Sequence, residues 1–431
     1  MGVTYLKKAT VAQAAEGADV TGIVADMLAR MRAEGEGAAL DYAKTLDGWE
    51  GDVLVPRETL EAAIDEVPSA DRGAIEFAHH NIRRFAEAQR ASLTEAEIEL
   101  RPGLVAGQRV IPVQSAGCYV PGGRYAHVAS ALMTIATAKA AGVGQITAAT
   151  PPRDGAIPAA VLYAMHLAGA DRVLAMGGVQ AIGAMAMGFF GGTPADILVG
   201  PGNQFVAEAK RQMFGPLGID MFAGPTDSMI LADASADAET VAWDLIGQAE
   251  HGANSPVWLA TTHRPLAEAV LAIIPRLYAS LPELNAAAAR AAWDQLGEVI
   301  LCDTREDMAR IADTYAPEHL QVQASDLEWW LEQLQCYGSL FLGENTTVAF
   351  GDKASGTNHV LPTSRAARYT GGLSVHKFLK ITTWQTMEPE AIVPVASATA
   401  RISRLEGMEG HALTADLRIE KLKAARAIAG E

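Results

Sequence analysis

QRVIPVQ (residues 108–114) runs directly into SAGCYVPGGR (residues 115–124), and the rest of the architecture can be worked out from this junction. The first run has the length and apolar content of a strand, and the second is a glycine-rich turn. A helical pattern follows from Ala129 to Ala141. A strand, a glycine turn and a helix in this order predict one βα step of a parallel sheet.

The same alternation continues along the chain in two series, one before and one after Asp227. Apolar strand-like runs occur at 145–149, 172–176, 196–199, 228–232, 257–261, 298–302 and 338–342, with helical patterns between them. The fold class is therefore predicted as α/β, with two Rossmann-like parallel-sheet units. Ligands of such sheets bind at the carboxyl ends of strands, where PGG (121–123), GG (177–178) and GPGN (200–203) fall. These turns could bind phosphate or serve only as tight connections.

The predicted domain organisation has four parts. Residues 1–20 form an N-terminal arm, and a helical N-terminal region begins at residue 21. Residues 21–118 and 226–373 form the main α/β domain, and residues 119–225 form a second α/β domain. The tail, 374–431, is rich in Ala, Arg and Glu and is predicted to be a helical arm that packs on a partner subunit.

Composition limits the partners of the chain. Its 431 residues are 49% hydrophobic and 20% charged, with a net charge of −17, as in folded globular proteins. This charge excludes nucleic acid or an anionic membrane as the main partner, because both need a positive surface. A small anionic substrate stays possible, since one local Arg can hold it. No apolar run is long enough to span a bilayer, and three scattered cysteines without a CxxC pattern favour a cytoplasmic location.

Gln248 and His251 lie late in a predicted helix that begins near Ala238. They are three residues apart, so on a helix they share one face. An amide oxygen and an imidazole nitrogen so placed can bind one metal ion, and zinc usually takes four such ligands. Asp352 and His411 are the candidates for the other two positions. The alternative is that Gln248 and His251 form an ordinary polar helix end.

Three further stretches could carry chemistry. Glu318 and His319 are adjacent, and a His near neutrality can take a proton from an alcohol while a Glu activates water. A surface pair is the alternative. Asp352 shares the loop GDKASGTNHVLPT (351–363) with Asn358 and His359, a composition typical of site walls. In the tail, His411 follows Glu406 by one turn and a half of helix.

Cys118 lies beside a glycine turn, where a thiol could attack an aldehyde and form a thiohemiacetal. We favour a packing role instead, because no positive neighbour in the sequence lowers its pKa. Four histidines have no partner pattern and are interpreted as structural: His127, His166, His263 and His376.

Nearly the whole chain resembles the histidinol dehydrogenase family. The resemblance is carried by eight motifs: GCYVPGGR (117–124), GGVQAIGAMA (177–186), LVGPGNQFVAEAKR (198–211), GIDMFAGPTDSMILAD (218–233), GQAEHG (247–252), APEHLQV (316–322), GDKASGTNHVLPT (351–363) and GHA (410–412). It implies a homodimer with shared active sites that uses zinc and NAD. The implied reaction oxidises a primary alcohol through the aldehyde to the carboxylate and yields two NADH.

Transferred motif by motif, the resemblance also implies the role of each residue. Zinc is held by four residues: Gln248, His251, Asp352 and His411. His411 and Glu406 reach in from the partner subunit. Glu318 and His319 are the acid–base pair, and His359 lines the substrate pocket. Residues 119–225 become the NAD-binding domain, with three cofactor contacts: Tyr119, Gln180 and Asn203.

The chain departs from the biosynthetic members of this family around the predicted site. The biosynthetic motif AGPSE is AGPTD here (223–227). The Tyr that usually follows the zinc-binding Asp is Lys353, and the Glu often found four residues before that Asp is Val348. A small residue after PGG is replaced by Arg124. Histidinol is a cation, so this loss of acid and gain of base favours an anionic or neutral diol.

These departures resemble a catabolic branch that oxidises 2,3-dihydroxypropane-1-sulfonate to sulfolactate. Its expected substrate contacts are Arg124, Thr226, His359 and Glu406. The alternative is oxidation of L-histidinol to L-histidine, with Arg124 and Lys353 as surface residues. A more distant alternative is a zinc hydrolase or an inactive NAD-binding paralogue.

Overall fold

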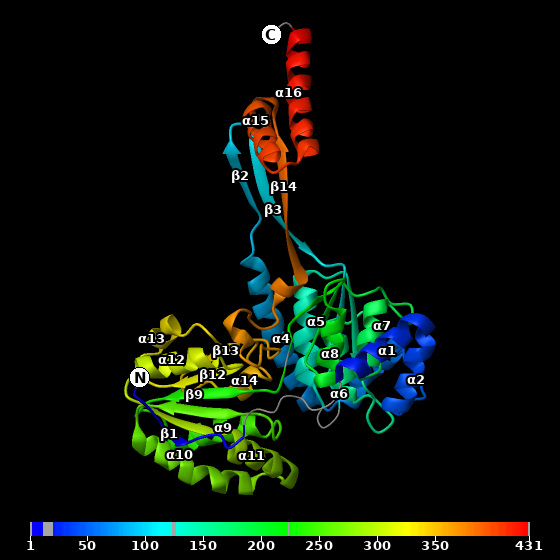
Figure 1. Ribbon diagram of the computed structural model, residues 1–431. Coiled ribbons are helices and arrows are strands. Elements are labelled where there is room, and N and C mark those ends of the chain that lie inside the picture. Colours follow the sequence, from blue (N-terminus) through cyan, green and yellow to red (C-terminus); the bar gives the residue numbers. More distant parts are fainter. Residues whose placement is uncertain (1, 12–19, 123–125, 223, 430–431) are drawn as a thin grey trace. The chain divides into compact units, whose positions relative to one another are not determined.

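The chain folds into two compact units (Figure 1). The computed structural model describes residues 2–11, 20–122, 126–222 and 224–429. The larger unit takes its residues from 1–90 and 113–378, and the smaller unit from 91–112 and 379–431. Among the described residues, no helix combines the length and apolarity needed to cross a bilayer.

The first sheet of the larger unit has six strands in the order β1-β11-β10-β9-β12-β13. Five are parallel, and β1 pairs antiparallel with β11 at one edge. The strands are β1 (Val3–Lys7), β9 (Ser228–Ala232), β10 (Val257–Thr261), β11 (Glu298–Cys302), β12 (His319–Gln323) and β13 (Ser339–Leu342).

Helices cover both faces of this sheet, which explains its apolar strands. On β9, Ile230 points to the core under α9 (Ala238–Ala249), α10 (Arg264–Leu277) and α11 (Glu283–Leu296). Met229 points to the opposite core, under α12 (Arg305–Tyr315) and α13 (Leu327–Gln333). Both side chains are buried because neighbouring residues of a strand face opposite sides.

The second sheet of the larger unit has five parallel strands in the order β6-β5-β4-β7-β8. The strands are β4 (Ser115–Tyr119), β5 (Gln145–Thr150), β6 (Arg172–Ala175), β7 (Ile197–Val199) and β8 (Gly218–Ile219). The helices that follow them are α5 (Val128–Ala141), α6 (Ala159–Ala168), α7 (Gly178–Met187) and α8 (Gln204–Met213). The parallel α/β class predicted from the alternating pattern is confirmed.

The first two helices pack on this second sheet. Leu28 of α1 (Val20–Glu34) shares a core with Ile182 of α7 and Val206 of α8, and Ala39 of α2 (Glu36–Leu46) joins the same core. We expected residues 21–118 to belong with the first sheet. Helices α1 and α2 belong to the second sheet instead, because α1 packs on α7 and α8 and α2 packs on α7.

Further short or peripheral elements complete the larger unit. They are α3 (Arg57–Glu66), α4 (Ser69–Ala91), α14 (Val348–Gly351) and three 3-10 turns, η1 (Tyr278–Ser280), η2 (Ala366–Arg368) and η3 (Val375–Phe378). Helix α3 packs on α6. On α4, the amide of Asn81 donates to the carbonyl of Ala354 at 2.9 Å and so supports the loop after α14.

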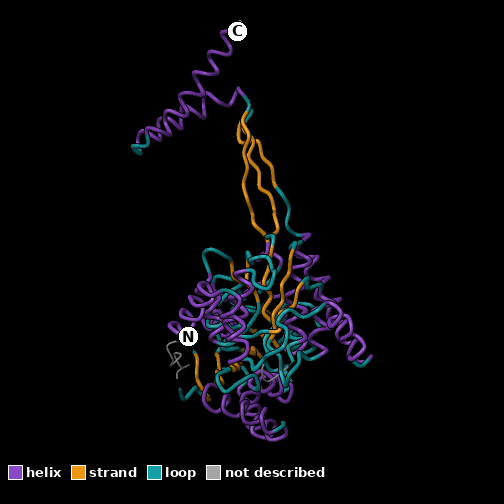
Figure 2. Tube along the Cα trace, turned by 90° about the vertical axis from the view of Figure 1, so that its right-hand side faces the viewer, coloured by secondary structure: helices purple, strands orange, loops and turns teal. Residues whose placement is uncertain are grey.

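The smaller unit is an antiparallel sheet with a helical hairpin. Its strands are β2 (Ala96–Arg101), β3 (Leu104–Pro112) and β14 (Leu379–Met387), and its helices are α15 (Pro389–Leu405) and α16 (Glu409–Ala429). The hairpin packs through small residues such as Ala396 and Ala412, and Figure 2 shows the three strands side by side. We expected helix from residue 374, but after the 3-10 turn η3 the tail forms β14, which pairs with β3 along its whole length.

Candidate active site

Glu318 and His319 lie at the point where β12 begins, and Asp227 directly precedes β9. His319 is in register with Ser228, the first residue of β9. The expectation that ligands bind at the carboxyl ends of strands therefore does not hold for the first sheet. Its candidate catalytic pair lies at the amino ends, where the returning helix α9 also finishes.

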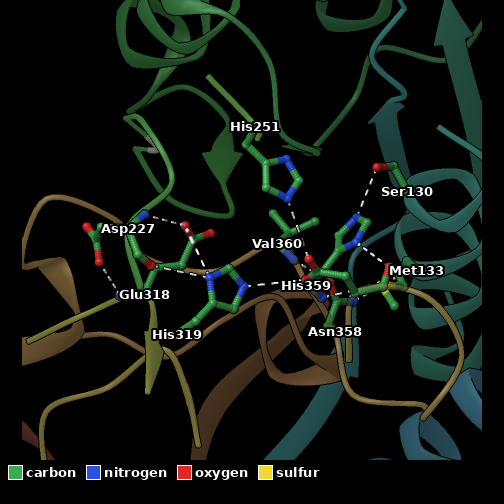
Figure 3. Close-up of polar contacts among 10 residues, drawn as sticks. Ser130, Met133, Asp227, His251, Glu318, His319, Asn358, His359 and Val360 are labelled. Carbon is green, nitrogen blue, oxygen red and sulfur yellow. Dashed lines mark hydrogen bonds and ion pairs between the residues drawn. The ribbon is translucent and has the colours of Figure 1, made fainter. Parts of the chain in front are cut away.

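Asp227 and Glu318 are linked by two hydrogen bonds, each from the backbone amide of one residue to the carboxylate of the other (Figure 3). The Glu318 amide donates to Oδ1 of Asp227 at 2.7 Å, and the Asp227 amide donates to Oε2 of Glu318 at 3.3 Å. Burial raises the pKa of Asp227 to about 6 and that of Glu318 to about 8. Glu318 can therefore exchange a proton near neutral pH, as a general acid or base must.

The imidazole of His319 lies between carboxyl groups. Its Nδ1 is 3.7 Å from Oε2 of Glu318, and its Nε2 is 3.4 Å from Oδ1 of Asp352. Burial opposes its protonation, but Glu318 and Asp352 outweigh that effect and raise the pKa of His319 to about 9. Within the described chain, Nε2 is buried without a hydrogen bond, so it is available to a ligand.

His251 approaches the same carboxylate, with Nε2 at 3.9 Å from Oδ2 of Asp352. Burial lowers the pKa of His251, which keeps its ring neutral and able to bind a metal. The expectation that Gln248 and His251 share a helix face needs correction, because α9 ends at Ala249. His251 follows in a turn, where its amide donates to the carbonyl of Gln248 at 3.2 Å.

The donor set of this cluster fits zinc. The Oε1 atom of Gln248 is buried and has no hydrogen-bond partner among the described residues, which is costly unless a ligand binds it. With the imidazole of His251 and the carboxylate of Asp352 it makes an N and O set of the kind zinc takes. Among the described residues, no three His, Cys, Asp or Glu side chains gather as a metal site. The fourth expected ligand, His411, is exposed in the smaller unit.

His359 connects two parts of the larger unit (Figure 3). Its Nδ1 is 2.9 Å from the carbonyl oxygen of Asp352, and its Nε2 is 2.9 Å from Oγ of Ser130 on α5. Nδ1 must donate to a carbonyl, so Nε2 accepts from the Ser130 hydroxyl. Both ring nitrogens are thus occupied, and His359 acts as a support for Asp352. Its expected contact with substrate stays a prediction.

A cavity of about 630 Å³ opens at the carboxyl ends of the second sheet. Tyr119, Gln180 and Asn203, the three expected NAD contacts, all line it. Such a volume is typical of small-molecule and cofactor sites. The buried Oε1 of Gln180 has no partner among the described residues, so it can accept a hydrogen bond from a bound molecule. Asn203 caps α8, accepting from the amides of Phe205 and Val206.

The glycine turn after β7 is fixed by a buried ion pair. Gly200 has φ 116°, and a Cβ there would lie 2.0 Å from the carbonyl oxygen of Tyr119, so only glycine fits. Lys210 donates to the carbonyl of Gly200 at 2.9 Å, and the amide of Gly200 donates to Asp220 at 2.7 Å. The buried Lys210 and Asp220 side chains also pair with each other. This places Tyr119 and the 200–203 turn at one cavity wall.

The remaining expected residues are distributed as follows. Arg124 lies outside the described residues. Thr226 is half-buried next to Asp227, and Glu406 is exposed at the end of α15 in the smaller unit. Cys118 is fully buried in β4, and burial raises the pKa of its thiol, which agrees with the packing interpretation.

Two residues of these sites were missed by sequence reasoning. Asp47, at the end of α2, accepts from the amide of Gly177 and the side chain of Gln180, each at 2.9 Å, and lines the cavity. Ser130 supports His359 from α5. Neither belongs to a pattern with nearby residues. Asp47 could have been suspected only as an acid at the end of a predicted helix.

The cavity beside one sheet and the zinc-compatible acid–base centre beside the other fit an NAD-dependent dehydrogenase that acts on CH–OH groups, the class that comparisons with known proteins also support. The sequence pattern of the histidinol dehydrogenase family matches residues 11–419. The chain therefore belongs to the histidinol dehydrogenase family, which uses NAD and zinc.

Relatives cover almost the whole chain. It is 66% identical over 98% of its length to a histidinol dehydrogenase homolog of Ruegeria pomeroyi, which is covered to 98%. It is 58% identical over 98% of its length to a sulfopropanediol 3-dehydrogenase of the same organism, covered to 97%. A crystal structure of histidinol dehydrogenase from Elizabethkingia anophelis superposes with a TM-score of 0.90 at 32% identity, covering 95% of this chain and 94% of that one.

Proposed function

We propose that this enzyme oxidises a small anionic diol, 2,3-dihydroxypropane-1-sulfonate, at its primary alcohol to the carboxylate sulfolactate. The observation that carries the proposal is Lys353, an exposed side chain that directly follows the expected zinc ligand Asp352. Burial lowers the pKa values of His127, His251 and His359, and the positive charge of Lys353 lowers all three further. Two of these histidines, His251 and His359, contact Asp352, so the positive charge that follows this residue favours an anion at the candidate site.

Two further observations support an anionic substrate. The relative named sulfopropanediol 3-dehydrogenase is 58% identical, whereas the histidinol dehydrogenase of known structure is 32% identical. Arg124 would add a guanidinium, which binds sulfonate oxygens through paired hydrogen bonds. Its role is proposed from the sequence, as are those of Thr226 and Glu406.

The proposed chemistry has two oxidation steps. The neutral form of His319, which its raised pKa makes a strong proton acceptor, takes the hydroxyl proton as the first hydride leaves the CH₂OH carbon, which gives the aldehyde, one NADH and one proton. Glu318 then takes a proton from the water that adds to the aldehyde, and loss of the second hydride gives the carboxylic acid and a second NADH. The acid releases its remaining proton to give the carboxylate. Asp227 holds Glu318 in place through the backbone bond at 2.7 Å.

The cofactors are held by separate groups of residues in this proposal. Zinc is held by Gln248, His251 and Asp352, and it would supply orientation and Lewis-acid assistance at the substrate oxygen. NAD would be held in the cavity lined by Tyr119, Gln180 and Asn203, where it would supply the hydride acceptor. The fourth zinc ligand is His411 of the partner subunit in a homodimer with shared active sites.

The test is the yield of NADH per substrate consumed, measured with zinc-loaded enzyme on the sulfonate and on L-histidinol. Two NADH from the sulfonate and none from L-histidinol are expected. Two NADH from L-histidinol alone would contradict the proposal and favour histidine biosynthesis.

The charge argument is tested with Lys353→Met, which keeps the length of the side chain, and with Arg124→Ala. Each should raise KM for the sulfonate about 10-fold or more, because a charge-assisted hydrogen bond is lost. Lys353→Arg is the matched control and should stay near the wild type. An unchanged KM in both Lys353→Met and Arg124→Ala would refute anion recognition by these residues.

A further inference from the structure

Asp244 joins three elements of the larger unit through its carboxylate. It lies on α9, one helical turn before Gln248. Its Oδ2 accepts from Nε2 of Gln321 at 2.7 Å and from Nε2 of Gln323 at 2.8 Å. Its Oδ1 accepts from Oγ1 of Thr347 at 2.8 Å.

Each of these elements carries part of the candidate active site. Helix α9 leads to Gln248, and β12 begins with His319. The single turn α14 has Thr347 as its N-cap and Asp352 as its C-cap. Because α14 is so short, the position of Thr347 largely determines where Asp352 lies.

Thr347 is used in an unusual way. Threonine at the N-cap of a helix usually accepts a bond from a backbone amide of that helix. Here no such cap bond forms, and the hydroxyl donates to Asp244. The Thr347 hydroxyl therefore bonds Asp244 on α9 and makes no capping bond to a backbone amide of α14.

The two strand residues that donate to Asp244, Gln321 and Gln323, are polar side chains whose burial costs free energy of folding. Gln321 and Gln323 are 0% and 2% exposed, and they alternate with the apolar Leu320 and Val322. They share a face with His319, the face covered by α9, since β12 pairs in register with β9. Their Oε1 atoms have no partner among the described residues, so each keeps an unpaired acceptor in the core. Apolar residues would avoid this cost, which argues that the bonds to Asp244 serve the site.

We propose that Asp244 is a positioning residue that holds Gln248, Asp352 and His319 in the arrangement zinc requires. The inference rests on the proposed function, in which Gln248 and Asp352 bind the metal. Partners behind metal ligands commonly affect metal affinity by about 10- to 100-fold.

Two substitutions separate position from charge. Asp244→Ala removes all three bonds, and zinc affinity should fall about 10- to 100-fold. Asp244→Asn can keep them, because its oxygen accepts from both glutamines and its NH₂ donates to Thr347. It should bind zinc nearly as the wild type does.

Thr347→Val removes only the bond to α14 and should lose part of the zinc affinity, whereas Thr347→Ser keeps the hydroxyl and should not. Zinc affinity is measured by competition with a chelator, and NADH affinity by fluorescence as an internal control. The NAD cavity lies on the second sheet, so NADH affinity should be unchanged in all four variants.

The inference is overturned if Asp244→Ala binds zinc as tightly as the wild type. It is also overturned if Asp244→Ala and Asp244→Asn lose zinc and NADH affinity together, which would indicate general disruption. Asp352→Ala tests the ligand set separately. If the wild type lacks tight zinc binding, or Asp352→Ala retains it, the proposed metal site itself fails whatever Asp244 does.

Discussion

At the scale of single residues, the acid–base centre depends on paired contacts in which the amides of Asp227 and Glu318 each donate to the other's carboxylate. Glu318, His319 and the cavity residues Tyr119 and Gln180 occur in compact motifs, so their neighbourhood in sequence indicated a role. Asp227 entered the sequence analysis as the last residue of AGPTD, whereas in the structure its carboxylate accepts from the Glu318 amide. Such a role depends on a partner 91 positions away in the chain, which no local pattern encodes.

The three cysteines should differ in reactivity because they differ in burial. Cys118 and Cys302 are buried, burial raises the pKa values of both thiols, and Cys336 is half-buried. A thiol-specific reagent should therefore label Cys336 first in the native enzyme, as mass spectrometry of peptides can check. Cys118→Ala should still form two NADH per substrate. Loss of only the second NADH would mean that the thiol attacks the aldehyde after all.

At the scale of elements, the alternating strands and helices of the parallel sheets were predictable because buried strands are short apolar runs bounded by glycine turns. Strand β14 was not, since LKITTWQTM is largely exposed and pairs with β3 from far away in the sequence. The end of α9 was placed too late, because the turn after Ala249 keeps a helix-like spacing between Gln248 and His251.

Helix α8 should show a pH-dependent contribution to stability. Hydrogen bonds from Arg211, and then from Gln212, lower the pKa of Glu208 to about 2 from a usual value of 4.5, although burial opposes this. A depressed carboxyl pKa stabilises the fold above the usual value and loses that effect as pH falls toward the folded value. Glu208→Gln should lower the melting temperature by a few degrees at pH 7, and the difference should shrink between about pH 4.5 and pH 2. A difference that is constant down to pH 3 would contradict this explanation.

At the scale of the whole molecule, the two sheets use opposite strand ends. The cavity lies at the carboxyl ends of the second sheet, as the general rule for parallel sheets predicts, and the catalytic pair lies at the amino ends of the first. The sequence could not reveal this difference, because both kinds of end are marked by similar loops.

The shared site of the proposed homodimer can be tested by complementation. Chains carrying His411→Ala and chains carrying Asp352→Ala should each be inactive alone. If His411 of the partner subunit completes the site, a mixed dimer contains one site with neither substitution. Random reassortment of equal amounts should then restore about a quarter of the wild-type activity. No recovery in a mixture that mass spectrometry shows to contain mixed dimers would exclude the sharing.

The contacts that link Ser130 through His359 to Asp352 have a consequence for the evolution of substrate specificity in this enzyme. The 2.9 Å contacts on the two sides of the His359 ring connect α5, a helix of the second sheet, to Asp352, an expected zinc ligand. A mutation near Asp352 that shifts His359 would therefore also disturb the contact with Ser130 on α5, and it is less readily tolerated. New specificities should arise more readily at positions that make neither contact, such as 353, whose side chain is exposed.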